Sequence, residues 1–186
     1  MRKLWVLVFF MFLFGCSGEP TQMGRGLAFR EELLNGNGCT FTSRITADFG
    51  DKTYTFDLAC QGNRDGSLSF AVLSPDTISG ISGTLSAGGG KVTFEEDRAV
   101  AFPMLAEGEL TPVSGPWILY NTLRSGFIST CGVEGELLRL TMQDSYEEGA
   151  LQVDVWLSDE NRPVTAEILW QGHRVLSIYV TDFQIL

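Results

Sequence analysis

The sequence predicts a β-dominated α+β domain whose main element is a long antiparallel sheet. From residue 39 onward, short runs alternate apolar and polar side chains, which is the period of a strand with one buried face. Turn residues separate these runs, and the chain contains 21 glycines. Only residues 25–34 and 116–124 show the spacing of short helices.

Residues 25–34 are expected to form the first helix. It should end at Asn35-Gly36-Asn37-Gly38, because Gly and Asn tolerate the left-handed backbone conformation. The apolar stripe of this helix is expected to comprise Leu27, Phe29, Leu33 and Leu34. Its outward charged side chains are expected to be Arg30, Glu31 and Glu32.

The strands follow in two groups. Those expected in the first half of the chain are residues 39–46, 53–58, 68–72, 81–85, 92–94 and 99–102. A loop at 103–116 and a helix at 116–124 come next, with Pro116 in the first helical turn and Gly126 as the C-terminal cap. The strands expected in the second half are Leu137–Met142, Leu151–Leu157, Val164–Trp170 and Val175–Phe183.

The two helices are too small to cover a flat sheet of this size. They span roughly 15 Å and 13 Å, whereas about nine strands would be near 43 Å wide. The sheet is therefore expected to curl around the helices, which leaves a groove wherever side chains fail to fill it. The residues expected to line this groove are Tyr54, Phe56, Phe70, Phe94, Trp117 and Leu123. An ordinary filled core is the alternative for the same side chains.

Three cysteines lie in the strand-rich region, at Cys39, Cys60 and Cys131. If the first hairpin turn is centred between Phe49 and Gly50, Cys39 lies directly opposite Cys60. Directly opposed residues are close enough for a disulfide, and exported proteins readily oxidise such pairs. A bond between Cys39 and Cys60 is therefore expected, with Cys131 left over.

The N-terminus has the pattern of an export signal. Arg2 and Lys3 precede an apolar run from Leu4 to Phe14, which is too short for a transmembrane helix of about 20 residues. The following Leu13-Phe14-Gly15-Cys16 resembles the lipobox of bacterial lipoproteins. This resemblance implies a signal peptide at residues 1–15, a lipidated Cys16 and a tether at 16–24. The alternative is an uncleaved N-terminal anchor helix.

The net negative charge of the chain argues against some classes of binding partner. Without Arg2 and Lys3, 11 basic side chains remain against 23 acidic ones, a formal net charge of −12. Nucleic acid is therefore not expected as a partner, and anionic lipid head groups gain no electrostatic attraction. Membrane attachment, on the outer side of the cell membrane, is expected to come from the lipid on Cys16, since two acyl chains anchor stably.

Residues 25–186 resemble the LolA/LolB-like superfamily of lipoprotein carriers and its Gram-positive membrane lipoprotein relatives. The phrases that carry the resemblance are Gly66-Ser67-Leu68-Ser69-Phe70, Ser74-Pro75-Asp76-Thr77-Ile78-Ser79-Gly80-Ile81-Ser82-Gly83 and Val175-Leu176-Ser177-Ile178-Tyr179-Val180-Thr181-Asp182-Phe183. The resemblance implies that the curved antiparallel sheet forms an unclosed half-barrel with the helices on its concave face. It also implies that the cavity between sheet and helices binds acyl chains. It also implies an arginine that holds the helical lid, which the sequence does not place among Arg44, Arg139 and Arg174.

No pattern for catalysis, metal or cofactor binding stands out. His173 is the only histidine and falls in a predicted turn, and there is no CxxC pair. The sequence therefore favours a non-enzymatic protein that binds a lipid or another apolar ligand. A protein-interaction or structural module with the same fold is the main alternative, and a hydrolase is poorly supported because no nucleophile–base pair can be assembled.

Overall fold

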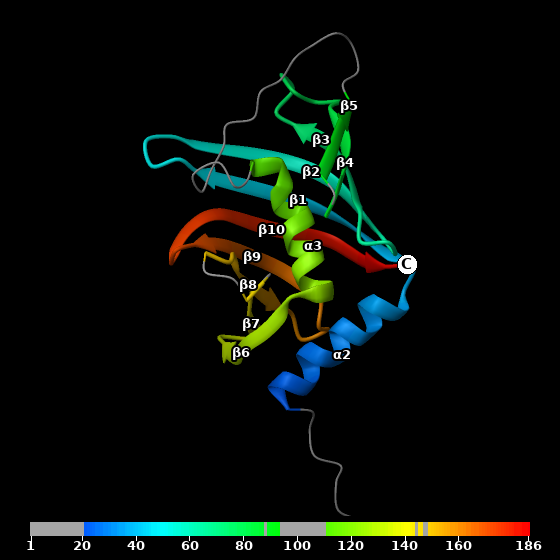
Figure 1. Ribbon diagram of the computed structural model, residues 1–186, viewed down its shortest axis with the longest axis vertical. Helices are drawn as coiled ribbons and strands as arrows, with labels where there is room; N and C mark the ends of the chain where they lie inside the picture. The colour runs from blue at the N-terminus through cyan, green and yellow to red at the C-terminus, as the bar shows by residue number, and fades with distance from the viewer. Residues whose placement is uncertain (1–20, 88, 94–110, 144, 147–148) are drawn as a thin grey trace, which may run out of the picture.

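The computed structural model describes residues 21–87, 89–93, 111–143, 145–146 and 149–186. Ten strands form one antiparallel sheet in the order β5-β4-β3-β2-β1-β10-β9-β8-β7-β6 (Figure 1). The described strands do not close into a barrel, since β5 and β6 lie at opposite edges. The sheet is curved, and both main helices cover one of its faces, so the predicted half-barrel is confirmed.

The first and last strands meet at the middle of the sheet. The bounds of the strands before the second helix are β1 Gly38–Asp48, β2 Thr53–Asn63, β3 Leu68–Ser74, β4 Ser82–Ser86 and β5 Gly89–Thr93. Those after it are β6 Phe127–Glu134, β7 Leu137–Gln143, β8 Gln152–Leu157, β9 Pro163–Trp170 and β10 His173–Ile185. Strand β1 pairs with β10, and Leu186 N donates to Gly38 O at 2.9 Å. The end of the described chain therefore lies beside the start of the sheet.

The concave face is covered by two helices. Helix α2 spans Gln22–Asn35, and helix α3 spans Gly115–Ser125 after a 3₁₀ turn, η2, at Pro112–Ser114. Alternate side chains of the central strands point to this face and are buried. The largest of the fully buried side chains are Tyr120, Phe29, Leu33, Ile45, Leu58, Leu68, Leu119, Leu138, Leu140, Met142, Leu157 and Ile168. One apolar core thus lies between the sheet and its helices.

Most predicted elements are confirmed, with two corrections. Strand β6 was not predicted, because Gly132 and an irregularity of pairing between Ile128 and Thr130 break the alternation of its sequence. Helix α2 buries Phe29 and Leu33, but Leu27 and Leu34 are exposed. The predicted strand at 99–102 lies outside the described residues.

The register of the first hairpin differs from the prediction by two residues. Asp48 pairs with Thr53, so the turn is centred between Gly50 and Asp51 and not one residue earlier. A shift of two residues keeps each side chain on its predicted face but changes every partner. Cys39 is opposite Gly62, and Cys60 is opposite Phe41.

A glycine on β2 allows α3 to approach the sheet. A Cβ atom on Gly62 would lie 2.6 Å from ring atoms of Tyr120. We expect Gly62→Ala to destabilise the fold by about 1–3 kcal/mol, because the helix must move to relieve the clash. Urea unfolding measures this free energy. The matched control is Gly132→Ala on β6, where a Cβ meets nothing within 4 Å; equal effects at the two sites would contradict the prediction.

Candidate functional site

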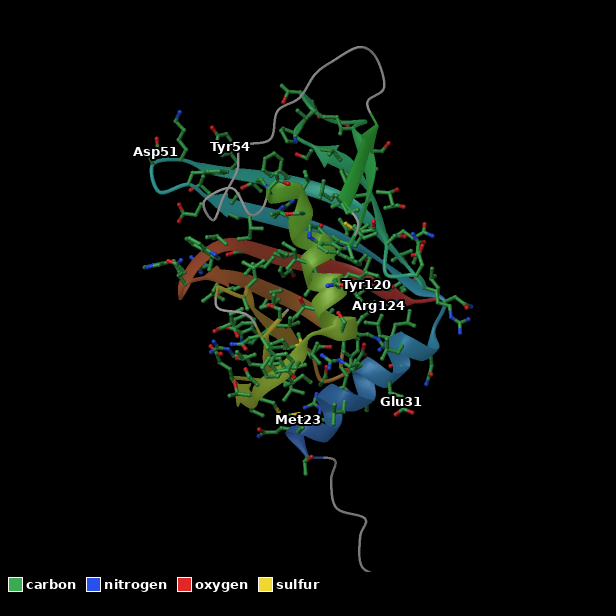
Figure 2. The ribbon with its side chains drawn as sticks, viewed as in Figure 1. Met23, Glu31, Asp51, Tyr54, Tyr120 and Arg124 are labelled. Atoms are coloured by element: carbon green, nitrogen blue, oxygen red, sulfur yellow. The ribbon has the colours of Figure 1, made fainter. Side chains whose placement is uncertain are left out.

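Helix α3 is held on the concave face by polar contacts to the turn between β2 and β3. The Tyr120 hydroxyl donates to Asn63 O at 2.7 Å, and Arg124 donates to Arg64 O at 2.8 Å and to the Tyr120 hydroxyl at 2.9 Å. At the other end of the helix, Trp117 Nε1 donates to Gly66 O at 3.2 Å. Side chains of the helix therefore donate to backbone carbonyl groups at the end of β2 and in the turn that follows it. Tyr120 and Arg124 are labelled on the helix in Figure 2.

Arg30 ties α2 to the end of α3. Its Nε donates to Leu123 O at 2.8 Å and its Nη2 reaches Thr122 O at 3.4 Å. These carbonyls belong to the last turn of α3, where a cation also interacts favourably with the helix dipole. Burial lowers the pKa of Arg30. The prediction that Arg30 lies on the outer face of the helix is therefore wrong. Arg30 lies one helical turn after Gly26, and the structure shows that Gly26 is buried.

The sequence does not assign the lid-holding arginine among three candidates, and all three lie on the outer face of the sheet, opposite the helices. Arg44 pairs with Asp57 at 2.7 Å, and Arg174 pairs with Glu167 at 2.8 Å. Arg139 pairs with Asp154 at 2.6 Å. The arginines that hold α3 in place are instead Arg30, which reaches it from α2, and Arg124, which belongs to α3 and binds Arg64 O.

The centre of the concave face is filled with side chains. Phe70 and Leu123, both expected on a groove wall, are buried, and so is Phe56 near the edge of the cluster. Trp117 is partly buried against the same core. Phe94 lies outside the described residues. An apolar ligand could contact Phe70 and Leu123 only if α3 moved away from the sheet.

The inner face of β2 continues beyond the filled centre toward the tip of the first hairpin. Tyr54 shares a face with Phe56 and Leu58, yet it is 41% exposed. Its ring lies 5.5 Å from the ring of Phe49 and 6.5 Å from that of Phe56, measured between centroids. Figure 2 places Tyr54 close to Asp51, at the tip of the hairpin. This end of the half-barrel therefore presents an accessible aromatic surface.

The predicted disulfide is absent, and the structure records all three described cysteines as free. The shifted register puts Cys39 and Cys60 diagonally on neighbouring strands and not directly opposite each other. Burial raises the pKa of each of these two thiols to about 12. Both therefore remain protonated at neutral pH and behave as small apolar core residues.

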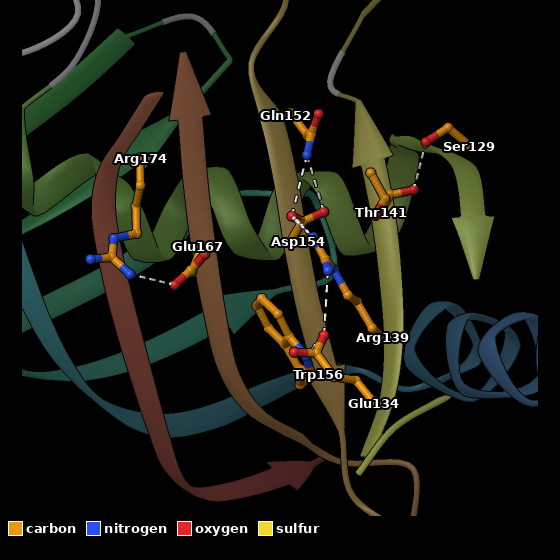
Figure 3. A network of polar contacts seen from close by, with 9 residues as sticks. All are labelled: Ser129, Glu134, Arg139, Thr141, Gln152, Asp154, Trp156, Glu167 and Arg174. Carbon is orange, nitrogen blue, oxygen red and sulfur yellow. Dashed lines mark hydrogen bonds and ion pairs between the residues drawn. The ribbon is translucent and has the colours of Figure 1, made fainter. Parts of the chain in front are cut away.

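A polar network lies on the outer face of the sheet, over the strands near the β6 edge (Figure 3). The Asp154 side chain is only 1% exposed and accepts hydrogen bonds from Arg139 Nη2 at 2.6 Å and Gln152 Nε2 at 3.2 Å. The Arg139 guanidinium lies over the Trp156 ring, 5.1 Å from its centroid, and Trp156 Nε1 donates to Glu134 at 3.0 Å. The contacts link β6, β7 and β8, which is a structural role.

Small side chains leave a hollow of about 500 Å³ on the outer face over β1, β2 and β3. Its outward-facing wall contains Thr40, Thr42, Ala59, Gln61, Ser69 and Ala71. These residues alternate with the buried side chains of the same strands. The hollow therefore lies on the opposite side of the sheet from the core and is separate from the aromatic surface at Tyr54.

Two further properties of the described part of the chain bear on function. No group of three or more His, Cys, Asp or Glu side chains among these residues could hold a metal ion. None of the helices described is both long and apolar enough to span a membrane. His173 is exposed at the start of β10, in the hairpin turn where the sequence placed it.

No protein-family model and no curated protein matches this chain. Among solved structures, a LolA superfamily protein from Nitrosomonas europaea is similar with a TM-score of 0.43 and 7% identity, over 87% of this chain and 93% of that one. The lipoprotein LppX of Mycobacterium tuberculosis gives a TM-score of 0.42 and 8% identity, over 89% and 96% of the two chains. A putative outer membrane lipoprotein-sorting protein domain from Vibrio parahaemolyticus gives 0.40 and 10%, over 86% and 90%. The first of these structures carries the name of the superfamily that the sequence resembles.

The bond from Arg30 to the end of α3 can be tested by substitution. We expect Arg30→Gln to lower the free energy of unfolding by about 1–2 kcal/mol, because a half-buried carbonyl loses its charged donor. Hydrogen exchange should also accelerate in the last turn of α3 more than in β8. The exposed neighbour Glu31→Gln is the control. Unchanged exchange in α3 would show that Arg30 does not hold this helix.

Proposed function

We propose that this protein is a non-catalytic lipoprotein of the bacterial cell envelope, anchored through Cys16 on the outer side of the cell membrane. Its half-barrel binds an apolar ligand, such as a lipid or an acyl chain, on the concave side. The observation that carries this proposal is the aromatic surface at the hairpin tip, where the apolar inner face of the sheet extends beyond its helical cover at Tyr54.

The shape of this surface suits an elongated apolar ligand. The Phe49 and Tyr54 rings meet edge to face, and Tyr54 stacks on Phe56, which is buried. Aromatic side chains bury a large apolar area with few rotatable bonds. A ligand that enters at Tyr54 and follows β2 toward Phe70 would displace α3 from the core.

The contacts of α3 are compatible with such a movement. The helix buries Ile118, Leu119 and Leu123 in the core, a contact that an apolar ligand in the same place would replace. Its polar contacts are the hydrogen bonds that Trp117, Tyr120 and Arg124 donate to the β2–β3 turn, together with the bond from Arg30. Hydrogen bonds of this kind stabilise by about 0.5–1.5 kcal/mol each. Burial of an acyl chain, at about 0.8 kcal/mol per CH₂ group, could offset their loss.

An interaction module is the second candidate, and the filled centre of the concave face favours it. Phe70, Leu119 and Leu123 are all buried there. In this alternative the half-barrel serves as a rigid scaffold, and a protein partner binds its surface. Direct measurement of ligand binding separates the two candidates.

Binding of a fluorescent fatty acid tests the proposed site. We expect the protein to bind it and Tyr54→Asp to weaken binding by at least about tenfold, or about 1.4 kcal/mol, because a charge then enters the apolar surface. The readout is a fluorescence titration at fixed protein concentration.

The matched control is Tyr179→Asp, which introduces the same charge at a tyrosine that is 58% exposed on the outer face of β10. It should leave the affinity unchanged. Unfolding curves of both variants show whether each remains folded. If the unsubstituted protein does not bind the fatty acid, or if the two substitutions have equal effects, the proposed ligand site is contradicted and the interaction module is favoured.

The anchor can be tested independently of the ligand. We expect Cys16→Ala to abolish acylation, because the thiol that carries the lipid is missing, and to leave the precursor uncut or release the protein from the membrane fraction. Metabolic labelling with a palmitate analogue measures this. Label that persists in the variant would contradict the anchor.

A further inference from the structure

Helix α2 has a second apolar face that the core does not use. Met23, Leu27 and Leu34 are 37%, 51% and 44% exposed. At about 100° per residue, Leu27 and Leu34 lie only about 40° and 20° around the helix from Met23. The three side chains therefore form one stripe, about 16 Å long at 1.5 Å per residue.

This stripe is distinct from the face that packs on the sheet. Gly26, Phe29 and Leu33 are buried, and a Cβ on Gly26 would lie 2.9 Å from Leu140. Their mean direction is about 100° around the helix from that of the stripe. The helix thus has one apolar face for the core and another that faces solvent (Figure 2, where Met23 and Glu31 are labelled).

The position of the stripe in the chain indicates what covers it. Cys16, the proposed lipid attachment site, precedes the first residue of α2, Gln22, by only six positions. Six residues span at most about 20 Å when fully extended. A lipid anchor would therefore keep α2 within reach of the bilayer surface, at an effective concentration on the order of millimolar.

The charges around the stripe favour apolar contact over electrostatic attraction. Arg25 donates to Asn161 and to Ser158 O, and Arg30 donates to Leu123 O. Glu32 pairs with Arg162 at 2.7 Å. The basic groups of the helix are thus directed into the protein, and Glu31 beside the stripe is exposed and acidic. The fitting partner is the interface of a bilayer with zwitterionic head groups.

We propose that the face of α2 formed by Met23, Leu27 and Leu34 rests on the membrane surface and orients the half-barrel there. This inference depends on the proposed anchor at Cys16 but not on the proposed ligand. The lipid anchor supplies the affinity for the membrane, and the helix face determines which side of the domain points toward it.

Photocrosslinking of the full lipidated protein in phosphatidylcholine vesicles tests the inference. Benzoyl-phenylalanine replaces Leu27 or Leu34, and in the control it replaces Leu73, which is 49% exposed on the outer face of β3. We expect lipid adducts, identified by mass spectrometry, at positions 27 and 34 and none at position 73. A probe at position 23 should lose its adduct in the Leu27→Glu, Leu34→Glu double variant.

Separate readouts distinguish failure of the inference from failure of the proposed function. Acylated protein that gives no lipid adducts at 27 and 34, or equal adducts at 73, would overturn the membrane-facing helix and leave the anchor intact. Adducts to a second copy or to another protein would overturn it in favour of a protein interface. Absence of acylation would refute the anchor and, with it, the inference. Fatty-acid binding is measured in the same preparation and should not change in the double variant.

Discussion

The close contact of α3 with β2 is the constraint on which the rest of the structure depends. Gly62 leaves space for the Tyr120 ring against the strand. The backbone oxygen of the next residue, Asn63, accepts a hydrogen bond from the Tyr120 hydroxyl at 2.7 Å. A side chain at position 62 would push the helix outward and open the core beneath Leu119 and Leu123. Helix α3 can therefore lie close against the curved sheet because the strand beneath it lacks a side chain at the point of crossing.

The sequence predicts the strands well because their alternation depends only on which face is buried. It predicts their pairing less well. When the hairpin turn moves by one residue, each residue pairs with a partner two positions away. Every side chain then still points to the same face of the sheet, so the hydrophobic pattern does not distinguish the two registers. Cys39 and Cys60 appeared to be opposite partners for this reason, whereas Cys60 is opposite Phe41. Strand β6 was missed since its edge position and Gly132 weaken its alternation.

The candidate site was predicted only in part, because local spacing does not show where a helix crosses a sheet. Phe56 and Phe70 have the predicted inward direction and are buried, whereas Tyr54, on the same face of β2 as Phe56, is exposed. The same limit applies to α2, which carries apolar residues in two directions. Leu27 and Leu34 were assigned to the core and Arg30 to solvent, yet burial of Gly26 turns the helix so that Arg30 reaches α3.

The two proposed surfaces lie at opposite ends of the molecule, and this arrangement constrains how they can work together. Met23 at the start of α2 and Tyr54 near the hairpin tip are widely separated in Figure 2. If the face of α2 rests on the bilayer, the aromatic entrance points away from the membrane. A ligand would then reach Tyr54 from the extracytoplasmic side, carried by another protein or released into solution, and not by direct extraction from the membrane beneath α2.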